Sequence, residues 1–446
     1  MYICKELASF GSKLAYSDLS EDTLYHAKRA LIDWYAALIA GYETDITQIL
    51  IKASADDIDR GDAHLALGRP ATARSAALIN GTAAHAAEVD DIYREAIYHP
   101  GAPTISAALA AAEKAKKNGL ELLRAIIVGY EISTRIGRSM GRAHYQYWHN
   151  TGTVGSFGSA AAVGTLLNLP AQSLAHALAT VATFAAGLQG AFQMDSMSKP
   201  LHSGRAAEAG LLAANLAANG GTGALDVLES DLGFGAAMSK NVDWGAALQD
   251  LGEQFLIESM TFKNHACCGH TFAAIDGALA LKNEYSIDPQ EISHIRIGSY
   301  QPALEVAGNS NPKTAAEARF SIPFVVATAL LHESVRLSAF SVPRLADQNI
   351  RDLMKKITLY VETACDDKFP AQRSALVTIE LKNGKKLQKL QPTRKGDPDL
   401  PLTDQELNDK FIELVSPILG TIRARDKLDL LWALDEKATA QDILSY

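Results

Sequence analysis

The chain has 446 residues, of which 48% are hydrophobic and 21% are charged. This composition excludes general disorder, and the length is sufficient to bury a core without disulfide or metal support. The net charge of -9, with no basic stripe, argues against a nucleic-acid partner. The four cysteines are too few for a disulfide framework.

No targeting or membrane signal is evident. Residues 1–20 lack a basic segment followed by an apolar run, and the apolar stretch 176–192 is broken by Thr, Gly and Gln. We therefore expect a cytoplasmic protein without membrane attachment.

Residues 1–259 are predicted to form a large all-helical domain. Ser20 is a suitable cap, residues 21 and 22 are acidic, and apolar residues follow at helical spacing as far as Trp34. The same periodicity predicts helices over 71–89, 105–118, 120–140, 158–167, 171–192 and 204–219.

A smaller α+β domain with an antiparallel sheet is predicted over 260–395. A helix is expected over 271–283, and strands over 292–298, 357–361, 375–381 and 386–390. The Asn383-Gly384 pair between the last two strands is a strong hairpin signal. Residues 396–446 are expected to return to the large domain as helices, which makes the fold mainly α.

The first candidate motif is the loop after the predicted helix 71–89. It carries the carboxylates Glu88, Asp90 and Asp91, and then His99 before a Pro-Gly turn. Such a set of titratable groups suits acid–base chemistry. A solvated helix end with a Pro-Gly turn explains the same spacing equally well.

The second motif is His149 followed by glycines at 152, 155 and 158. Glycines permit close backbone approach at a helix start, where free N–H groups bind anions. No predicted strand precedes them and no Gly-Lys-Ser/Thr follows, which argues against a nucleotide site. On spacing alone, tight helix packing with a buried histidine is the better explanation.

The third motif, Lys199, His202 and Arg205, lies at the start of an Ala-rich helix. Cations at a helix start interact unfavourably with the helix dipole, but together with the helix they can bind an anion. Scattered surface cations are the alternative explanation.

The fourth motif lies at the predicted domain junction, where ligand clefts are common. It contains Lys263, His265, Cys267, Cys268 and His270, whose spacing fits no standard zinc site. Carboxylates, imidazoles and ammonium groups without a nucleotide loop or metal cage suit a cofactor-free reaction on a small polycarboxylate.

Four segments together resemble the MmgE/PrpD family over nearly the whole chain: HNTGTVGSFGSAAA, SKPLHSGRAAEAG, DD…HPGAP and KNHACCGHTFAAID. This family includes 2-methylcitrate dehydratase, cis-aconitate decarboxylase and iminodisuccinate epimerase. The resemblance implies a large helical domain, a smaller α+β lid, a cleft between them and a homodimer. It implies neither a metal nor an organic cofactor.

The resemblance also implies a set of site residues. We expect catalytic roles for His149, Asp91, Lys199 and Lys263, and substrate-binding roles for Glu88, Asp90, His99, His202, Arg205, Cys268 and His270. Three departures from decarboxylase-like members stand out. The acidic loop is one residue longer, Cys268 replaces a histidine, and Phe324 replaces a tyrosine found in many members.

These departures bear on the reaction. A dehydratase needs an acid for the departing hydroxyl, which Phe324 cannot supply, whereas an epimerase only removes and returns a proton. The sequence therefore favours an isomerase, an epimerase of the iminodisuccinate type. The alternatives are a hydro-lyase of the 2-methylcitrate type, a cis-aconitate-type decarboxylase, and a non-enzymatic helical binding or scaffold protein.

Overall fold

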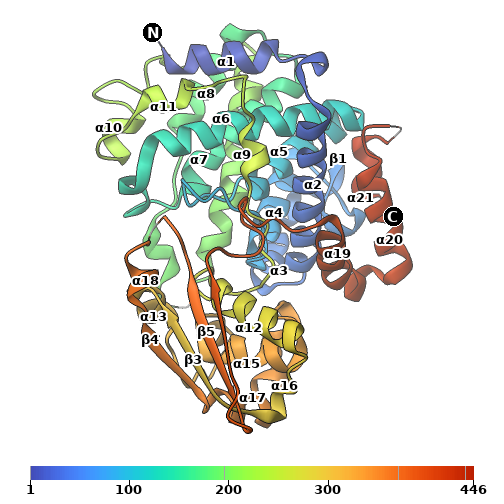
Figure 1. The fold of residues 1–446 in the computed structure, drawn as a ribbon. Coiled ribbons are helices and arrows are strands. Elements are labelled where there is room, and N and C mark those ends of the chain that lie inside the picture. Colours follow the sequence, from blue (N-terminus) through green and yellow to red (C-terminus); the bar gives the residue numbers. More distant parts are fainter. Residues whose placement is uncertain (1, 195, 370, 437, 446) are drawn as a thin grey trace. The chain divides into compact units, whose positions relative to one another are not determined.

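A computed structural model describes residues 2–194, 196–369, 371–436 and 438–445. The chain divides into two compact units (Figure 1). Unit 1 comprises Met1–Phe262 and Thr403–Tyr446, and unit 2 comprises Lys263–Leu402. The fold is mainly α, as predicted, and the sheet of unit 2 is small.

The centre of unit 1 is the helix α7 (Asn150–Leu166), which is buried along its whole length. It packs against α5 (Gly101–Lys114), α6 (Gly119–Tyr145) and α9 (Ser198–Ala218), and α4 (Ala73–Ala86) packs on α5 and α9. Small residues make this packing possible. A Cβ atom at Gly158 would lie 2.4 Å from Thr104 Oγ1 and 2.8 Å from Ser133 Oγ.

Longer and shorter helices surround this centre. They are α1 (Ile3–Lys13), α2 (Glu21–Tyr42), α3 (Asp45–Ala53), α8 (Ala171–Ala182), α10 (Phe234–Met238) and α11 (Trp244–Leu248). Ser20 caps α2 as predicted, since its side chain accepts a hydrogen bond from Thr23 N at 3.0 Å.

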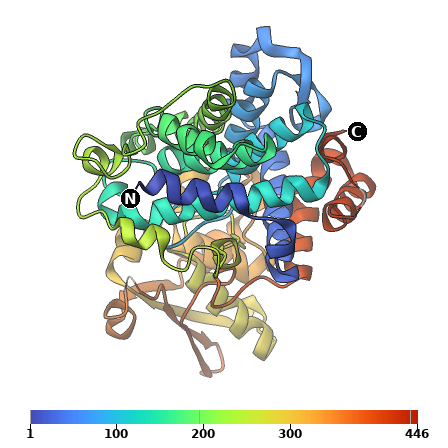
Figure 2. The same cartoon turned by 90° about the horizontal axis from the view of Figure 1, so that it is seen from above.

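The last helices of the chain belong to unit 1. They are α19 (Asp404–Leu419), α20 (Thr421–Trp432) and α21 (Ala440–Leu444). Both views show α19 and α20 (red) beside α2 (blue), and the buried Lys410 Nζ lies 2.5 Å from Asp33 Oδ1 on α2 (Figures 1 and 2).

Three local features of unit 1 differ from the sequence prediction. The strands β1 (Ile58–His64) and β2 (Pro70–Ala71) pair antiparallel and were not predicted, because four consecutive exposed residues in β1 hide any alternation. The helix predicted over 158–167 begins at Asn150, so the three glycines lie within α7 and serve its packing. The helix predicted over 171–192 ends at Ala182.

Unit 2 contains a four-stranded sheet of order β4-β3-β5-β6. Its strands are β3 (Ile292–Ser299), β4 (Ile357–Val361), β5 (Ala375–Leu381) and β6 (Lys386–Gln391). β3–β5 and β5–β6 are antiparallel, whereas β3–β4 is parallel, so the sheet is mixed. The segment between β3 and β4 is long enough for the crossover that a parallel pair needs.

Helices of unit 2 pack on the sheet and on one another. α12 (Phe272–Tyr285) packs on β5 and β6, and α15 (Ile322–His332) packs on α12 and on α17 (Gln348–Met354). The remaining helices are α13 (Gln301–Ala307), α14 (Ala315–Arg319), α16 (Val342–Leu345) and α18 (Thr363–Asp366).

The predicted hairpin is confirmed. Its turn spans 382–385, and Gly384 has the positive φ of +83°. Among the described residues, no helix combines the length and apolar character needed to cross a membrane.

Candidate active site

Four histidines from distant parts of unit 1 form an imidazole cluster: His85, His99, His149 and His202. His85 lies in the last turn of α4, His99 just before α5, His149 at the cap of α7, and His202 in the second turn of α9. The ring centroids lie 4.8 Å apart for His85–His99, 5.3 Å for His85–His149 and 5.3 Å for His149–His202.

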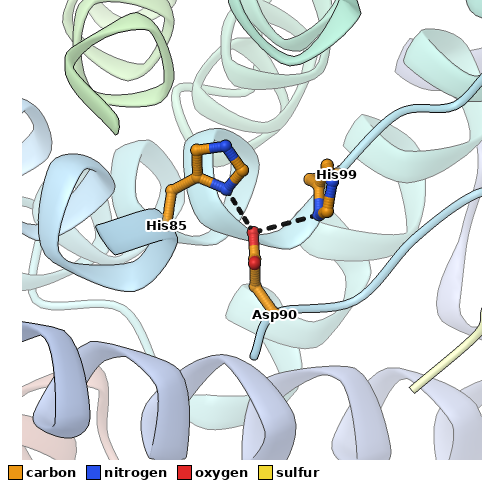
Figure 3. A group of neighbouring side chains, drawn as sticks. All are labelled: His85, Asp90 and His99. Atoms are coloured by element: carbon orange, nitrogen blue, oxygen red, sulfur yellow. Dashed lines mark hydrogen bonds and ion pairs between the residues drawn. The ribbon is translucent and has the colours of Figure 1, made fainter. Parts of the chain in front are cut away.

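The buried carboxylate of Asp90 joins two of these rings. Its Oδ2 atom lies 2.6 Å from His85 Nδ1 and 3.2 Å from His99 Nδ1 (Figure 3). Two ligands of one tetrahedral metal ion, each about 2.1 Å from it, would lie roughly 3.4 Å apart. The 2.6 Å separation is instead typical of a hydrogen bond that His85 donates.

The other two rings also contact each other. The Nδ1 atoms of His149 and His202 lie 3.1 Å apart, so one ring donates a hydrogen bond to the other. Burial lowers the pKa of His149 well below its usual value, and His85, Lys199, His99 and His202 lower it further. Burial, His85 and Lys199 likewise lower the pKa of His202. Both imidazoles are therefore neutral at pH 7 and can accept a proton.

A lysine and an aromatic ring border the cluster. Lys199, in the first turn of α9, contacts the carboxylate of Glu88 through Nζ. The same Nζ atom lies 5.2 Å from the centroid of the Phe192 ring, which packs edge-on against His149 at 4.9 Å. A cation is thus held next to a neutral imidazole.

A cavity of about 580 Å³ adjoins His202. Its lining includes Gly152 and Ser156 of α7, the segment 186–191, and Arg205 of α9. This volume suits a small ligand. The Arg205 side chain is 67% exposed and its guanidinium contacts Glu208, so it lies at the rim.

A larger cavity of about 700 Å³ lies elsewhere in unit 1, lined by residues such as Arg74, Lys114 and Leu211. It contains none of the predicted site residues. We therefore place the candidate site at the imidazole cluster.

Asp91 lies next to Asp90 in the chain but has different partners. Its carboxyl group accepts hydrogen bonds from Tyr130 Oη at 2.8 Å and from the backbone N–H of Gly101 at 3.0 Å. Burial, reinforced by Asp33 and Asp90, raises the pKa of Asp91 to about 8. Asp91 is therefore mostly protonated at pH 7 and holds the first residue of α5.

Unit 2 brings Lys263, Cys268 and His270 together before α12. Burial raises the pKa of the Cys268 thiol, although Arg373, Lys263 and Arg394 act in the opposite direction. Burial, with Arg373 and Arg394, lowers the pKa of His270 to about 4, and its Nδ1 lies 2.8 Å from Tyr300 Oη.

Two further residues of unit 2 have structural partners. His265 Nε2 lies 2.9 Å from Asp276 Oδ1. Phe324 is fully buried on α15 and faces the ring of Phe340 at 6.2 Å.

The structure thus groups most of the predicted site residues of unit 1: Glu88, Asp90, His99, His149, Lys199 and His202. No role was expected for His85 or Phe192. In the sequence His85 is marked only by its place on the last predicted turn, five residues before Asp90, which is an ordinary position for a histidine.

Comparisons with known proteins cover nearly the whole chain. The family profile described as the MmgE/PrpD N-terminal domain matches residues 5–247, and that of the MmgE/PrpD C-terminal domain matches 265–436. The chain is 26% identical to the cis-aconitate decarboxylase-like protein oryM of Aspergillus oryzae, covering 99% of this chain and 96% of that protein. It is 25% identical to a cis-aconitate decarboxylase of Aspergillus terreus (99% and 95% covered) and 27% identical to that of Mus musculus (95% and 88%).

Proposed function

The chain belongs to the MmgE/PrpD family, and on this premise we propose that it is a lyase that decarboxylates a small unsaturated polycarboxylate, as in the cis-aconitate reaction. Relatives named cis-aconitate decarboxylase align with nearly the whole chain, which supports a lyase over the epimerase that the sequence pattern favours.

The imidazole cluster with Lys199 is the observation that carries the proposal. In decarboxylation the bond between carbon and a carboxylate breaks, CO2 leaves, and the electron pair spreads over the double bond towards a second carboxylate. An imidazolium then donates a proton to carbon. His149 is neutral at rest, and an anionic substrate beside it would raise its pKa and let it take up that proton. Lys199 would offset the negative charge that develops.

Epimerisation is the second candidate. The absence of a phenol at Phe324 weighs against dehydration, which needs an acid for the departing hydroxyl. It does not weigh against decarboxylation or epimerisation, because neither reaction releases hydroxide. The raised pKa of the Cys268 thiol also weighs against dehydration, because such a thiol is a poor substitute for an imidazolium as the acid.

The test is incubation of the purified protein in D2O with cis-aconitate, with 2-methylcitrate and with iminodisuccinate. Decarboxylation predicts CO2 release and one solvent deuteron on carbon. Deuterium incorporation with inversion and without CO2 would establish the epimerase, and a new alkene from 2-methylcitrate the hydro-lyase. His149→Gln and Lys199→Met should each lower kcat/KM at least about 100-fold. Full activity in both variants would refute the assignment of the site.

We also propose the homodimer that the family resemblance implies. Large apolar side chains are exposed along the segment 184–197: Phe184, Leu188, Phe192, Met194 and Met197. Such a patch is typical of an interaction surface. Light scattering should give twice the 47.7 kDa of one chain, and a monomeric mass at micromolar concentration would contradict the proposal.

A further inference from the structure

We infer that His85 is a positioning residue of this site. The hydrogen bond that it donates to Asp90 weakens the attraction between that carboxylate and the imidazolium form of His99. The effect on catalysis rests on the proposed function. The effect on His99 itself follows from the geometry and can be measured without any substrate.

The residue type at position 85 is not explained by packing. The His85 side chain is fully buried, and its Nε2 atom has no hydrogen-bond partner among the described residues. A buried polar atom left in this way costs about 1–3 kcal/mol, which packing of the ring alone does not explain. The other ring nitrogen of His85, Nδ1, points at Asp90 and is hydrogen-bonded to it (Figure 3).

The same carboxylate oxygen serves two rings at unequal distances. Asp90 Oδ2 lies 2.6 Å from His85 Nδ1 and 3.2 Å from His99 Nδ1. The shorter contact is a charge-assisted hydrogen bond, which offsets part of the negative charge on this oxygen. Without it, an ionised Asp90 would attract the imidazolium form of His99 more strongly and raise the pKa of His99, because a facing carboxylate favours the charged form of an imidazole.

Other titratable groups lie near Asp90 and the two rings. They include His149 at the cap of α7, Lys199 and His202 on α9, and Asp91 and Glu88 in the same loop as Asp90. Asp91 is held by Tyr130 and Glu88 by Lys199. His149 and His202 act mainly on each other through their Nδ1 atoms. His85 and His99 contact the same oxygen of Asp90 and therefore compete for it.

Two variants separate the hydrogen bond from mere space filling. In His85→Asn the amide nitrogen stands where Nδ1 stood and can still donate to Asp90. In His85→Leu the volume of the ring is approximately kept and the donor is lost. The readout is an NMR titration of isotope-labelled histidine side chains in the full chain, with the His99 signal identified by its disappearance in His99→Gln.

We expect the pKa of His99 to rise by more than about 0.3 units in His85→Leu and to stay within about 0.3 units of the wild-type value in His85→Asn. Under the proposed function, kcat of His85→Leu falls about 10- to 100-fold with a smaller change in KM, and its pH profile moves to higher pH. His85→Asn restores the profile.

An unchanged pKa of His99 in His85→Leu, or an equal rise in both variants, would overturn the inference. The titration of His99 needs no substrate, so it tests the inference even if the protein shows no decarboxylase activity. Failure of the proposed function and failure of the inference are therefore distinguishable. Loss of folding in His85→Leu would show in the dispersion of the other histidine signals, and Asp90→Asn then supplies the second test. That variant should lower the pKa of His99.

Discussion

Asp91 offers a sharp test of how burial controls this loop. Its carboxyl group is buried and its pKa is raised from 3.8 to about 8. A group whose pKa is higher in the folded than in the unfolded state contributes stability that is complete below the unfolded value, here 3.8. That contribution is lost as the pH rises through 8. Folding therefore becomes less favourable by about 1.4 kcal/mol per pH unit between these values.

The perturbation is Asp91→Asn, which resembles the protonated acid. The amide oxygen can accept from the Gly101 N–H, and the amide nitrogen can donate to Tyr130 Oη once the hydroxyl rotates. Between pH 5 and pH 7 the wild type should lose about 2–3 kcal/mol that the variant keeps. The variant should thus gain on the wild type as the pH rises.

Urea midpoints at pH 5, 6 and 7, followed by tryptophan fluorescence, measure this difference. Asp59→Asn is the matched control, because Asp59 is exposed and paired with Arg69, which lowers its pKa, so its effect should be flat over this range. Parallel pH dependences of the wild type and Asp91→Asn would refute the reasoning and show that Asp91 is ionised in the folded protein.

Two further predictions concern packing and charge in unit 1. Gly158→Ala should destabilise the protein by about 1–3 kcal/mol, because its Cβ would lie 2.4 Å from Thr104 Oγ1. Gly190→Ala should change stability by less than about 0.5 kcal/mol, because among the described residues no atom beyond its chain neighbours lies within 4 Å of the added Cβ. Lys410→Met should cost about 3–5 kcal/mol because it removes the ammonium partner of the buried Asp33. The exposed pair Lys355–Asp352 is its control, and Lys355→Met should have almost no effect. Thermal unfolding of each variant beside its control checks both predictions. An equal loss of stability in a variant and its control would contradict the corresponding prediction.

Much of the architecture follows from patterns that are local in sequence. The cap at Ser20 and the hairpin at Gly384 were predictable because each depends on neighbouring residues alone. The parallel pairing of β4 with β3 was not, since strand direction depends on a long crossover and not on alternation within the strand. The start of α7 was missed because glycine is a weak helix former. Only tertiary packing explains glycine at such positions.

The candidate site divides in the same way. Residues such as His149 and Lys199 could be singled out because they sit beside helix starts, where charge and polarity conflict with local stability. His85 could not, because a histidine at a helix end is locally ordinary. The role proposed for His85 depends on its hydrogen bond to Asp90 and on its competition with His99, and both exist only in the folded loop. Two unequal contacts to one oxygen leave no trace in residue spacing, so the titration of His99 in the His85 variants tests a role that the sequence alone does not indicate.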